Sequence, residues 1–291
     1  MISFVGAGPG AADLITLRGA QRLGRADVVV WASSLVPDAL LSHTRPGAVV
    51  HDSATMTLED VLGVYADHPD AWIVRLHSGD PALYGAIQEQ IAWCVDNGRE
   101  LEIVPGVSSL GAAAAAAGRE LTVPALAQSV VMTRLAGRTA ASMPARESVA
   151  AFAAHGATMA VFLSGARPRQ LQDELLAEGS GYQADTPAII VVRASWPDEV
   201  VMPTTVGRLA EDLLATGART TVLVLVGPAL SGAAGSGDGA RSHLYSPAFS
   251  HQFRRRSLRG STAGRAAGPG GRPGETAISP SPGRRGAGWC R

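Results

Sequence analysis

The sequence predicts an α/β protein of two domains, each built on a mainly parallel sheet covered by helices. Short apolar segments rich in valine and isoleucine alternate with segments of helical periodicity along most of the chain. Glycine or proline turns follow several of these apolar segments, as is typical of strand ends in α/β proteins. The length of 291 residues is enough for two domains of ordinary size. We expect domains at 1–120 and 121–230, a linker and extension at 231–256, and a tail at 257–291.

The first domain is predicted to contain five strands and four helices. Thr16 is placed to cap the first helix, and Thr57 with Asp60 has the spacing of a capping box. Ser108 precedes an alanine-rich helix over 109–117, and Gly118 follows that helix. We expect the alanines to form a packing surface. The expected strands are residues 2–6, 28–31, 49–51, 71–74 and 101–104.

The stretch 75–85, Arg-Leu-His-Ser-Gly-Asp-Pro-Ala-Leu-Tyr-Gly, lies between an apolar strand and a helical pattern at 86–95. Gly79 permits a turn and a close approach of a ligand to the backbone. Asp80 can cap a following helix, with Pro81 in its first turn. Strand-to-helix corners of this kind bind ligands in open α/β sheets, although a short Gly-Asp-Pro alone also suits an ordinary helix start.

The second domain repeats the alternation of strands and helices. A strand at 129–133 is followed by helix 146–154, strand 158–163 and helix 167–178. Residues 188–192 form a strongly apolar strand, and 200–202 a short edge strand. The last elements expected are helix 206–215 and strand 221–226.

The C-terminal tail is dominated by Gly, Pro, Ser and Arg, with six arginines and the single acid Glu275. Such a composition cannot bury enough apolar surface to join a core, so we predict disorder over 257–291. Truncation after Arg256 should therefore leave folding and activity intact. Melting curves and turnover of the truncated chain check this, and a large fall in melting temperature would contradict it.

The composition limits the classes of chemistry. All 25 basic residues are arginines, which excludes a lysine Schiff base and a P-loop lysine. The two cysteines imply no disulfide framework, and the seven histidines show no metal-binding spacing. No apolar run is long enough to span a membrane, and the first residues lack the pattern of a secretory signal. We therefore expect a cytoplasmic protein that binds no metal or membrane. We also expect no nucleic-acid partner, although a basic disordered tail can touch nucleic acid weakly.

The loop Gly6-Ala7-Gly8-Pro9-Gly10-Ala11 follows the first strand and has the outline of a dinucleotide fingerprint. Pro9 removes an N–H from the loop that would cradle the pyrophosphate. The second strand also ends without an acid for a ribose hydroxyl. A nicotinamide-dependent enzyme is therefore only a second interpretation.

Three motifs in order resemble those of the tetrapyrrole methylase family: residues 6–10, 78–85 and 105–109 (Pro-Gly-Val-Ser-Ser). The resemblance covers about residues 1–256 and implies two α/β domains of the class III methyltransferase type. S-adenosylmethionine would bind in the cleft between them as methyl donor. Further segments are similar to the branch that methylates carbon 11 of precorrin-4 in cobalamin synthesis: 32–37, 55–59, 75–80, 118–124, 193–199 and 243–254.

The resemblance also implies which residues bind the ligands. Cofactor contacts fall on positions that match the family's motifs: Pro9, Ser78, Gly79, Asp80, Ser108, Ser109, Leu163 and Ala194, with Tyr84 as a further wall. Leu163 could shift to Phe162 in the alignment. The substrate would be a polycarboxylate macrocycle, so arginines near strand ends are candidates for its carboxylates. These are Arg75, Arg134, Arg138 and Arg193, with Arg18 in addition.

An electron-rich carbon and an activated methyl group need alignment more than a catalytic residue, so we assign no catalytic side chain. His77 is expected to be a hydrogen-bonded histidine beside a strand end, with proton transfer as the alternative. Methylation of another ring position, or of a cobalt-loaded substrate, stays open. So does a non-catalytic binding protein of the same fold. The family suggests a homodimer.

Overall fold

The structure is a computed structural model that describes residues 1–136, 140–144, 146–231 and 249. The described residues up to 231 belong to one compact unit that contains two five-stranded sheets. The first sheet has the order β3-β2-β4-β1-β5, and all of its pairings are parallel. Four strands match the expected segments to within one residue: β1 (Ile2–Gly6), β2 (Val28–Trp31), β3 (Val49–Asp52) and β5 (Leu101–Val104). The remaining strand, β4 (Ile73–His77), differs from the expected 71–74, so residues 75–77 belong to the strand and not to the corner that follows it.

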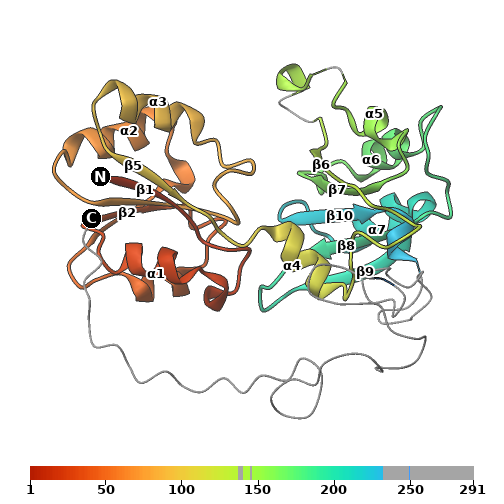
Figure 1. The fold of residues 1–291 in the computed structure, drawn as a ribbon, viewed down its shortest axis with the longest axis horizontal. Helices are drawn as coiled ribbons and strands as arrows, with labels where there is room; N and C mark the ends of the chain where they lie inside the picture. The colour runs from red at the N-terminus through yellow and green to blue at the C-terminus, as the bar shows by residue number, and fades with distance from the viewer. Residues whose placement is uncertain (137–139, 145, 232–248, 250–291) are drawn as a thin grey trace, which may run out of the picture. The chain divides into compact units, whose positions relative to one another are not determined.

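Helices cover both faces of this sheet, as Figure 1 shows. Helix α1 (Leu17–Leu23) packs on one face, and α2 (Leu58–Asp67) with α3 (Gln88–Asp96) covers the other. The predicted caps are confirmed, because Thr16 accepts a hydrogen bond from Gly19 N and Thr57 with Asp60 forms a full capping box. Sequence-local capping therefore decides where α1 and α2 begin.

The start of α3 is a correction to the sequence prediction. Asp80 does not cap this helix and Pro81 is not in its first turn, because residues 81–84 form a turn and α3 begins only at Gln88. Tyr84 and Ala86 have φ of 59° and 49°, a left-handed conformation that interrupts a helix. The corner is therefore a structured loop of its own between β4 and α3.

The second sheet has the order β6-β7-β10-β8-β9. Only the β6–β7 pairing is parallel, whereas β10 runs antiparallel to both neighbours and β9 runs antiparallel to β8. Mainly parallel pairing thus describes the first sheet, and the second is mixed. The link from β8 to β9 is too short for a parallel crossover. The strands are β6 (Val130–Arg134), β7 (Thr158–Phe162), β8 (Pro187–Val192), β9 (Val200–Thr205) and β10 (Val222–Val226).

The two faces of the second sheet carry different helices. One face packs against α5 (Val149–Ala153), α6 (Pro168–Leu175) and α7 (Leu209–Ala215). The other packs against α4 (Ser109–Ala116), whose Ala112 and Ala113 contact strand residues of β7, β8 and β10. The alanine run is thus a packing surface, as predicted. Helix α4 lies within the expected first domain, 1–120, but it packs on the sheet of the expected second domain.

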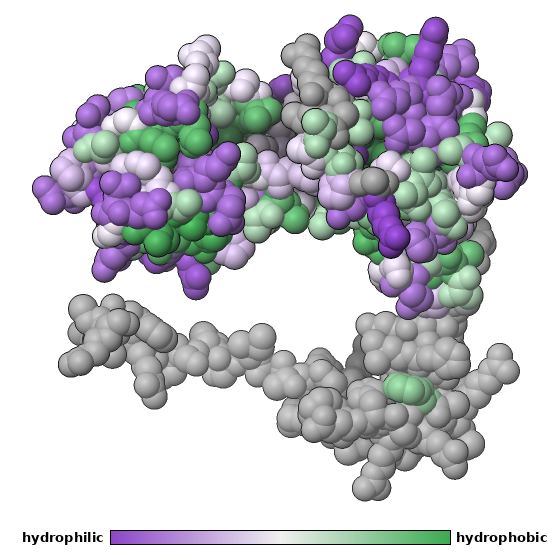
Figure 2. Space-filling model, turned by 90° about the horizontal axis from the view of Figure 1, so that it is seen from above, coloured by the Kyte–Doolittle hydropathy of each residue, from purple (hydrophilic) through white to green (hydrophobic). Residues whose placement is uncertain are grey.

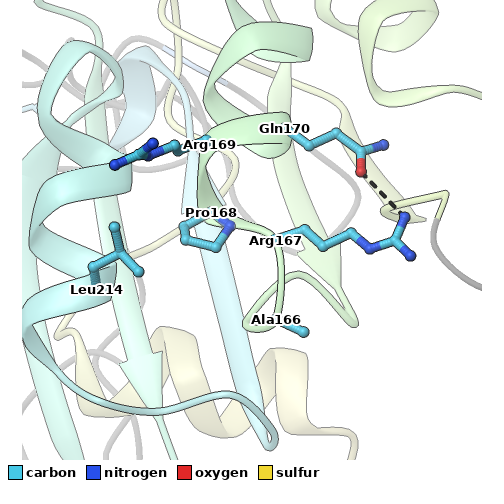
Figure 3. Close-up of a pocket in the computed structure, with 6 residues that line it drawn as sticks. All are labelled: Ala166, Arg167, Pro168, Arg169, Gln170 and Leu214. Carbon is cyan, nitrogen blue, oxygen red and sulfur yellow. Dashed lines mark hydrogen bonds between the residues drawn. The ribbon is translucent and has the colours of Figure 1, made fainter.

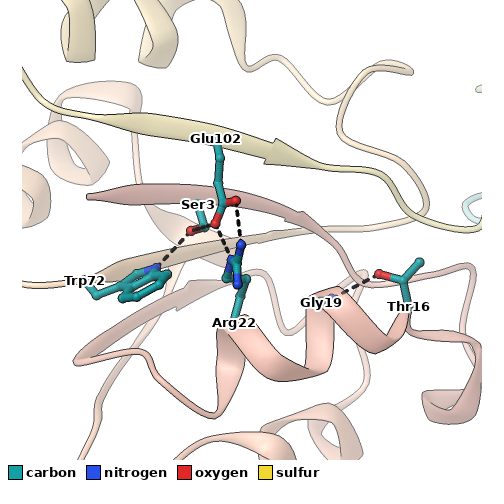
Figure 4. Close-up of polar contacts among 6 residues, drawn as sticks. All are labelled: Ser3, Thr16, Gly19, Arg22, Trp72 and Glu102. Carbon is teal, nitrogen blue, oxygen red and sulfur yellow. Dashed lines mark hydrogen bonds and ion pairs between the residues drawn. The ribbon is translucent and has the colours of Figure 1, made fainter. Parts of the chain in front are cut away.

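A polar network ties α1 to β1, to β5 and to Trp72, the residue before β4 (Figure 4). Arg22 donates two hydrogen bonds to Glu102, at 2.5 and 3.0 Å, and Ser3 Oγ donates to the same carboxylate at 2.7 Å. Trp72 Nε1 donates to Ser3 Oγ at 2.9 Å. Burial alone would raise the pKa of Glu102, but the bonds from Arg22 and Ser3 hold it below its ordinary value.

Because the pKa of Glu102 is depressed in the folded state, its contribution to stability is present above the unfolded pKa and is lost as pH falls. We expect Glu102→Gln to lower the free energy of unfolding by about 1 kcal/mol at pH 7, and the difference to shrink below pH 4.5. Urea unfolding of both proteins at each pH measures it. A difference that does not depend on pH would contradict this prediction.

Among the described residues, no helix is long and apolar enough to cross a membrane. Hydrophilic residues cover much of the coloured surface in the view of Figure 2, with apolar residues in separate groups. The predicted tail at 257–291 lies outside the described residues, and so does the extension at 231–256 apart from Ser231 and Phe249.

Candidate functional site

Three glycines bring the ends of β1, β4 and β5 into contact. A Cβ on Gly106 would lie 2.7 Å from Gly6 Cα and closer still to the carbonyl oxygen of Gly79, so no larger residue fits without a backbone shift. Gly79 has φ +66°, and it exchanges two backbone hydrogen bonds with Gly8 at 2.7 and 3.3 Å. We call Gly6, Gly79 and Gly106 the glycine junction. It fixes three strand-end loops in one place.

Asp80 connects two of these loops. Its Oδ2 accepts a hydrogen bond from Gly106 N at 2.9 Å, and its Oδ1 accepts one from Ala82 N at 2.8 Å. Both carboxylate oxygens are therefore held by backbone N–H groups, one within its own turn and one after β5. The side chain positions the junction, which is a different role from the helix cap expected from the sequence.

The glycine-rich loop after β1 contacts the turn between β8 and β9. Trp196 Nε1 donates to the carbonyl of Pro9 at 2.9 Å, and the indole lies so close to Gly10 that a Cβ there would clash with it. Ala11 N donates to Ser195 Oγ at 3.0 Å. With Gly8 N and Ala11 N already bonded and Pro9 lacking an N–H, the loop cannot cradle a pyrophosphate, which disfavours the nicotinamide interpretation.

Backbone strain is concentrated at one edge of the second sheet. Leu163 follows β7, Arg193 and Ser195 follow β8, and Thr221 precedes β10, all with φ between 50° and 66°. Such values cost free energy in residues with a Cβ, above all in β-branched Thr221. Arg193 N donates to the Thr221 carbonyl at 2.8 Å and links two of these segments. Strain of this kind is typical of ligand sites.

All nine residues predicted to contact the cofactor line one cavity of about 360 Å³. The loops that meet at the glycine junction provide Pro9, Ser78, Gly79 and Asp80, the start of α4 provides its N-cap Ser108 and Ser109, and the turn after β4 provides Tyr84. The strained edge of the second sheet provides Leu163 and Ala194. Phe162, the alternative to Leu163, lines it as well. The structure thus brings together residues 185 positions apart in the sequence.

The cavity suits a small amphipathic ligand such as S-adenosylmethionine. Apolar side chains form much of the wall, including Leu35, Leu83, Val191 and Leu223. Polar residues lie in several parts of the wall, including the start of α4 and the segment before β10. At Ser108 and Ser109 the first turn of α4 has N–H groups without helical partners. An aminocarboxylate matches these donors, and an adenine ring matches the apolar wall.

The arginines predicted to bind substrate fall in different places. Arg75 is largely buried and donates to Val30 O and Ser53 Oγ, so it lies outside the cavity wall and is a structural residue. Arg193 Nε donates to Asp198 at 2.6 Å, and its guanidinium lies 4.1 Å from the centre of the Trp196 ring.

Arg134 ends β6 opposite cavity-lining Phe162, and it donates to Ser142 Oγ at 2.9 Å. Burial raises the pKa of the Tyr84 phenol, and the positive charge of Arg134 opposes this effect in part by lowering that pKa. Arg18 lies on α1, where its charge helps to lower the pKa of Glu102. Arg138 lies outside the described residues.

His77 is a buried histidine directly before the corner. Burial, with a smaller contribution from the charge of Arg75, lowers its pKa to about 3, so its imidazole is neutral at physiological pH. It packs near Phe4, with ring centres 6.1 Å apart, and is not part of the cavity wall. Its buried Nε2 has no hydrogen-bond partner among the described residues, which differs from the hydrogen-bonded histidine expected from the sequence. Its place outside the cavity wall disfavours proton transfer to a ligand bound there.

Several cavity residues were not expected from the sequence. Arg219, Thr220 and Thr221 lie in the segment before β10, and Gly165 lies in the loop after β7. The antiparallel course of β10 places its beginning, rather than its end, at the cavity edge. The expectation of a parallel sheet could not place this segment at the cavity. The only signal in the sequence is the pair Thr220 and Thr221 directly before a buried strand.

A second, more open pocket of about 520 Å³ lies at the start of α6 (Figure 3). Arg167, Pro168 and Arg169 line it, with Leu214 of α7 on the far side. It contains none of the residues singled out in the sequence. Elsewhere in the described part of the chain, no cluster of His, Cys, Asp and Glu could hold a metal ion.

Comparison with known proteins gives one consistent group of relatives. The family model of the tetrapyrrole (corrin/porphyrin) methylases matches residues 1–210. The chain is 43% identical over 254 residues to the cobalt-precorrin-4 C(11)-methyltransferase of Priestia megaterium, which covers 87% of this chain and 96% of that protein. It is also 43% identical over 257 residues to the precorrin-4 C(11)-methyltransferase of a Sinorhizobium species, covering 88% and 98%.

Solved structures agree with this grouping. An X-ray structure of a cobalt precorrin-4 methyltransferase superposes with a TM-score of 0.75 and 42% identity, covering 79% of this chain and 96% of that one. The uroporphyrin-III C-methyltransferase of Thermus thermophilus, complexed with S-adenosylhomocysteine, has a TM-score of 0.64 and 27% identity, covering 79% and 98%. The resemblance seen in the sequence motifs is therefore confirmed at the level of fold and family.

Proposed function

The chain belongs to the tetrapyrrole (corrin/porphyrin) methylase family, and we propose that it transfers the methyl group of S-adenosylmethionine to carbon 11 of precorrin-4. The product would be precorrin-5, an intermediate of cobalamin biosynthesis. The observation that carries the proposal is one cavity lined by all eight residues at which the family's motifs place cofactor contacts, together with Tyr84, the expected further wall. Near-complete coverage of two relatives with this activity supports it.

The donor supplies an activated methyl sulfonium, and the protein's task is positioning. The glycine junction and Asp80 hold the loops that form one wall, and Ser108 and Ser109 offer N–H groups and hydroxyls to the polar end of the donor. Phe162, Leu163 and Val191 form an apolar part of the same wall. Alignment of two reactants can contribute about 7–11 kcal/mol to catalysis, so no general base is required of this chain.

The experiment is turnover of purified protein with S-adenosylmethionine and precorrin-4, supplied with and without cobalt. Mass spectrometry should show one added methyl group, and NMR should place it at carbon 11. A methyl group at another ring position, or cofactor binding without any transfer, would contradict the proposal. The cobalt comparison decides between the two substrate forms, both of which occur among the relatives.

The proposal includes two further expectations: a homodimer, which the family resemblance suggests, and a location in the cytoplasm, which the sequence composition suggests. Size-exclusion chromatography with light scattering tests the first, and cell fractionation tests the second. A monomeric protein with full activity would show that the active site needs no partner chain.

A further inference from the structure

Arg219 occupies a fixed position on the cavity wall. A Cβ on Gly165 would lie 3.0 Å from the carbonyl group of Arg219, so the loop after β7 packs tightly against its backbone. On one side, Ala218 N donates to Thr216 Oγ1 at 3.2 Å. On the other, the carbonyl of strained Thr221 accepts the bond from Arg193 N. The backbone that carries the guanidinium is therefore held on both sides.

The charge of Arg219 has no partner among the described residues. Arg22, Arg193 and Arg208 each pair with a carboxylate, whereas Arg219 makes no ion pair or hydrogen bond with that part of the chain. It is the one cationic side chain among the described residues of the cavity wall. The acid of that wall, Asp80, is already occupied by two backbone N–H groups.

We propose that Arg219 binds a carboxylate group of a ligand in this cavity and thereby determines which ligands are accepted. A guanidinium on an otherwise largely apolar wall favours a planar anion that it can grip with two parallel hydrogen bonds. The hydroxyls of Thr220 and Thr221 lie beside it in the sequence and on the same wall.

The inference rests on the proposed function, because that function supplies the two candidate carboxylate ligands, the tetrapyrrole and the methyl donor. The tetrapyrrole has several on its acetate and propionate arms, and the methyl donor has one on its methionine end. Ser108 and Ser109 at the start of α4 already suit the donor's aminocarboxylate. We therefore place an arm of the macrocycle at Arg219.

The test compares Arg219→Gln with Arg219→Lys and with the control Arg169→Gln. Arg169 is an exposed arginine of the same sheet's helical layer and lines the other pocket. Binding of three probes is titrated by calorimetry or fluorescence: uroporphyrin III, S-adenosylhomocysteine, and methylthioadenosine, which has no carboxylate. Melting curves confirm that each variant is folded.

We expect Arg219→Gln to weaken uroporphyrin III binding at least tenfold with the two nucleosides unchanged, Arg219→Lys to recover part of the loss, and Arg169→Gln to bind as wild type. A selective loss of affinity for S-adenosylhomocysteine, with methylthioadenosine affinity unchanged, would support carboxylate binding by Arg219 but would assign the carboxylate to the methyl donor. Equal weakening of both nucleosides, or no change in any probe, would overturn the inference. Wild-type binding of the probes without turnover of precorrin-4 would instead count against the proposed function alone.

Discussion

Replacing Gly106 with alanine should destabilise the protein and abolish cofactor binding together. The new methyl group would meet the carbonyl oxygen of Gly79 and the Cα of Gly6, both of which are backbone atoms that cannot rotate away. Overpacking of a close contact costs typically about 1–3 kcal/mol, and the shift would also open the wall formed by Ser108 and Ser109. We expect a lower melting temperature and a loss of S-adenosylhomocysteine affinity of tenfold or more.

Gly111→Ala is the matched control for this change. Gly111 lies in α4, five residues further along, and a Cβ there finds no atom within 4 Å. Glycine in a helix is less favourable than alanine by about 0.5–1 kcal/mol, so this variant should be slightly more stable and bind normally. A Gly106→Ala protein as stable as wild type would show that the three loops are not in contact.

Much of the fold follows from local patterns in the sequence. The run Val222–Val226 is apolar on both faces, which is typical of buried strands between helix layers. The run Ile2–Gly6 is likewise buried, with Ser3 as its one polar residue. Thr16 and Thr57 mark helix starts because a hydroxyl satisfies an N–H two or three residues later. These signals are local, and the structure confirms them within one to three residues at most element ends.

Strand direction in the second sheet could not be obtained in this way. Alternation of strands and helices is compatible with parallel and mixed sheets, and the decision depends on where β10 inserts between β7 and β8. The site residues that could be predicted are those in local sequence motifs, because such motifs do not depend on strand direction. Pro9, Ser108 and Ala194 lie on short recognisable segments, whereas Arg219 reaches the cavity only through the antiparallel course of β10.

Changing Asp80 to alanine should weaken S-adenosylmethionine binding at least tenfold while the fold survives. The carboxylate holds Gly106 N and Ala82 N, so its loss frees the two loops that form the cofactor wall. A hydrogen bond to a charged group contributes about 1.5–3 kcal/mol, and a tenfold loss of affinity corresponds to about 1.4 kcal/mol. Calorimetric titration of the cofactor beside a melting curve measures both effects. Asp80→Asn keeps one acceptor oxygen and should fall between alanine and wild type.

Asp60→Ala separates a positioning role from the loss of a cap. Asp60 also accepts a backbone hydrogen bond, from Thr57 N at 2.9 Å, but it lies at the start of α2 and not on the cavity wall. Its removal should cost about 1 kcal/mol of stability and leave cofactor affinity unchanged. If Asp80→Ala behaves in the same way, with an earlier melt and normal binding, then the corner after β4 is a structural turn alone. If only Asp80→Ala loses affinity, the carboxylate acts by holding the loop after β5 against the loop after β4, because no other described side chain joins Gly106 N to that turn.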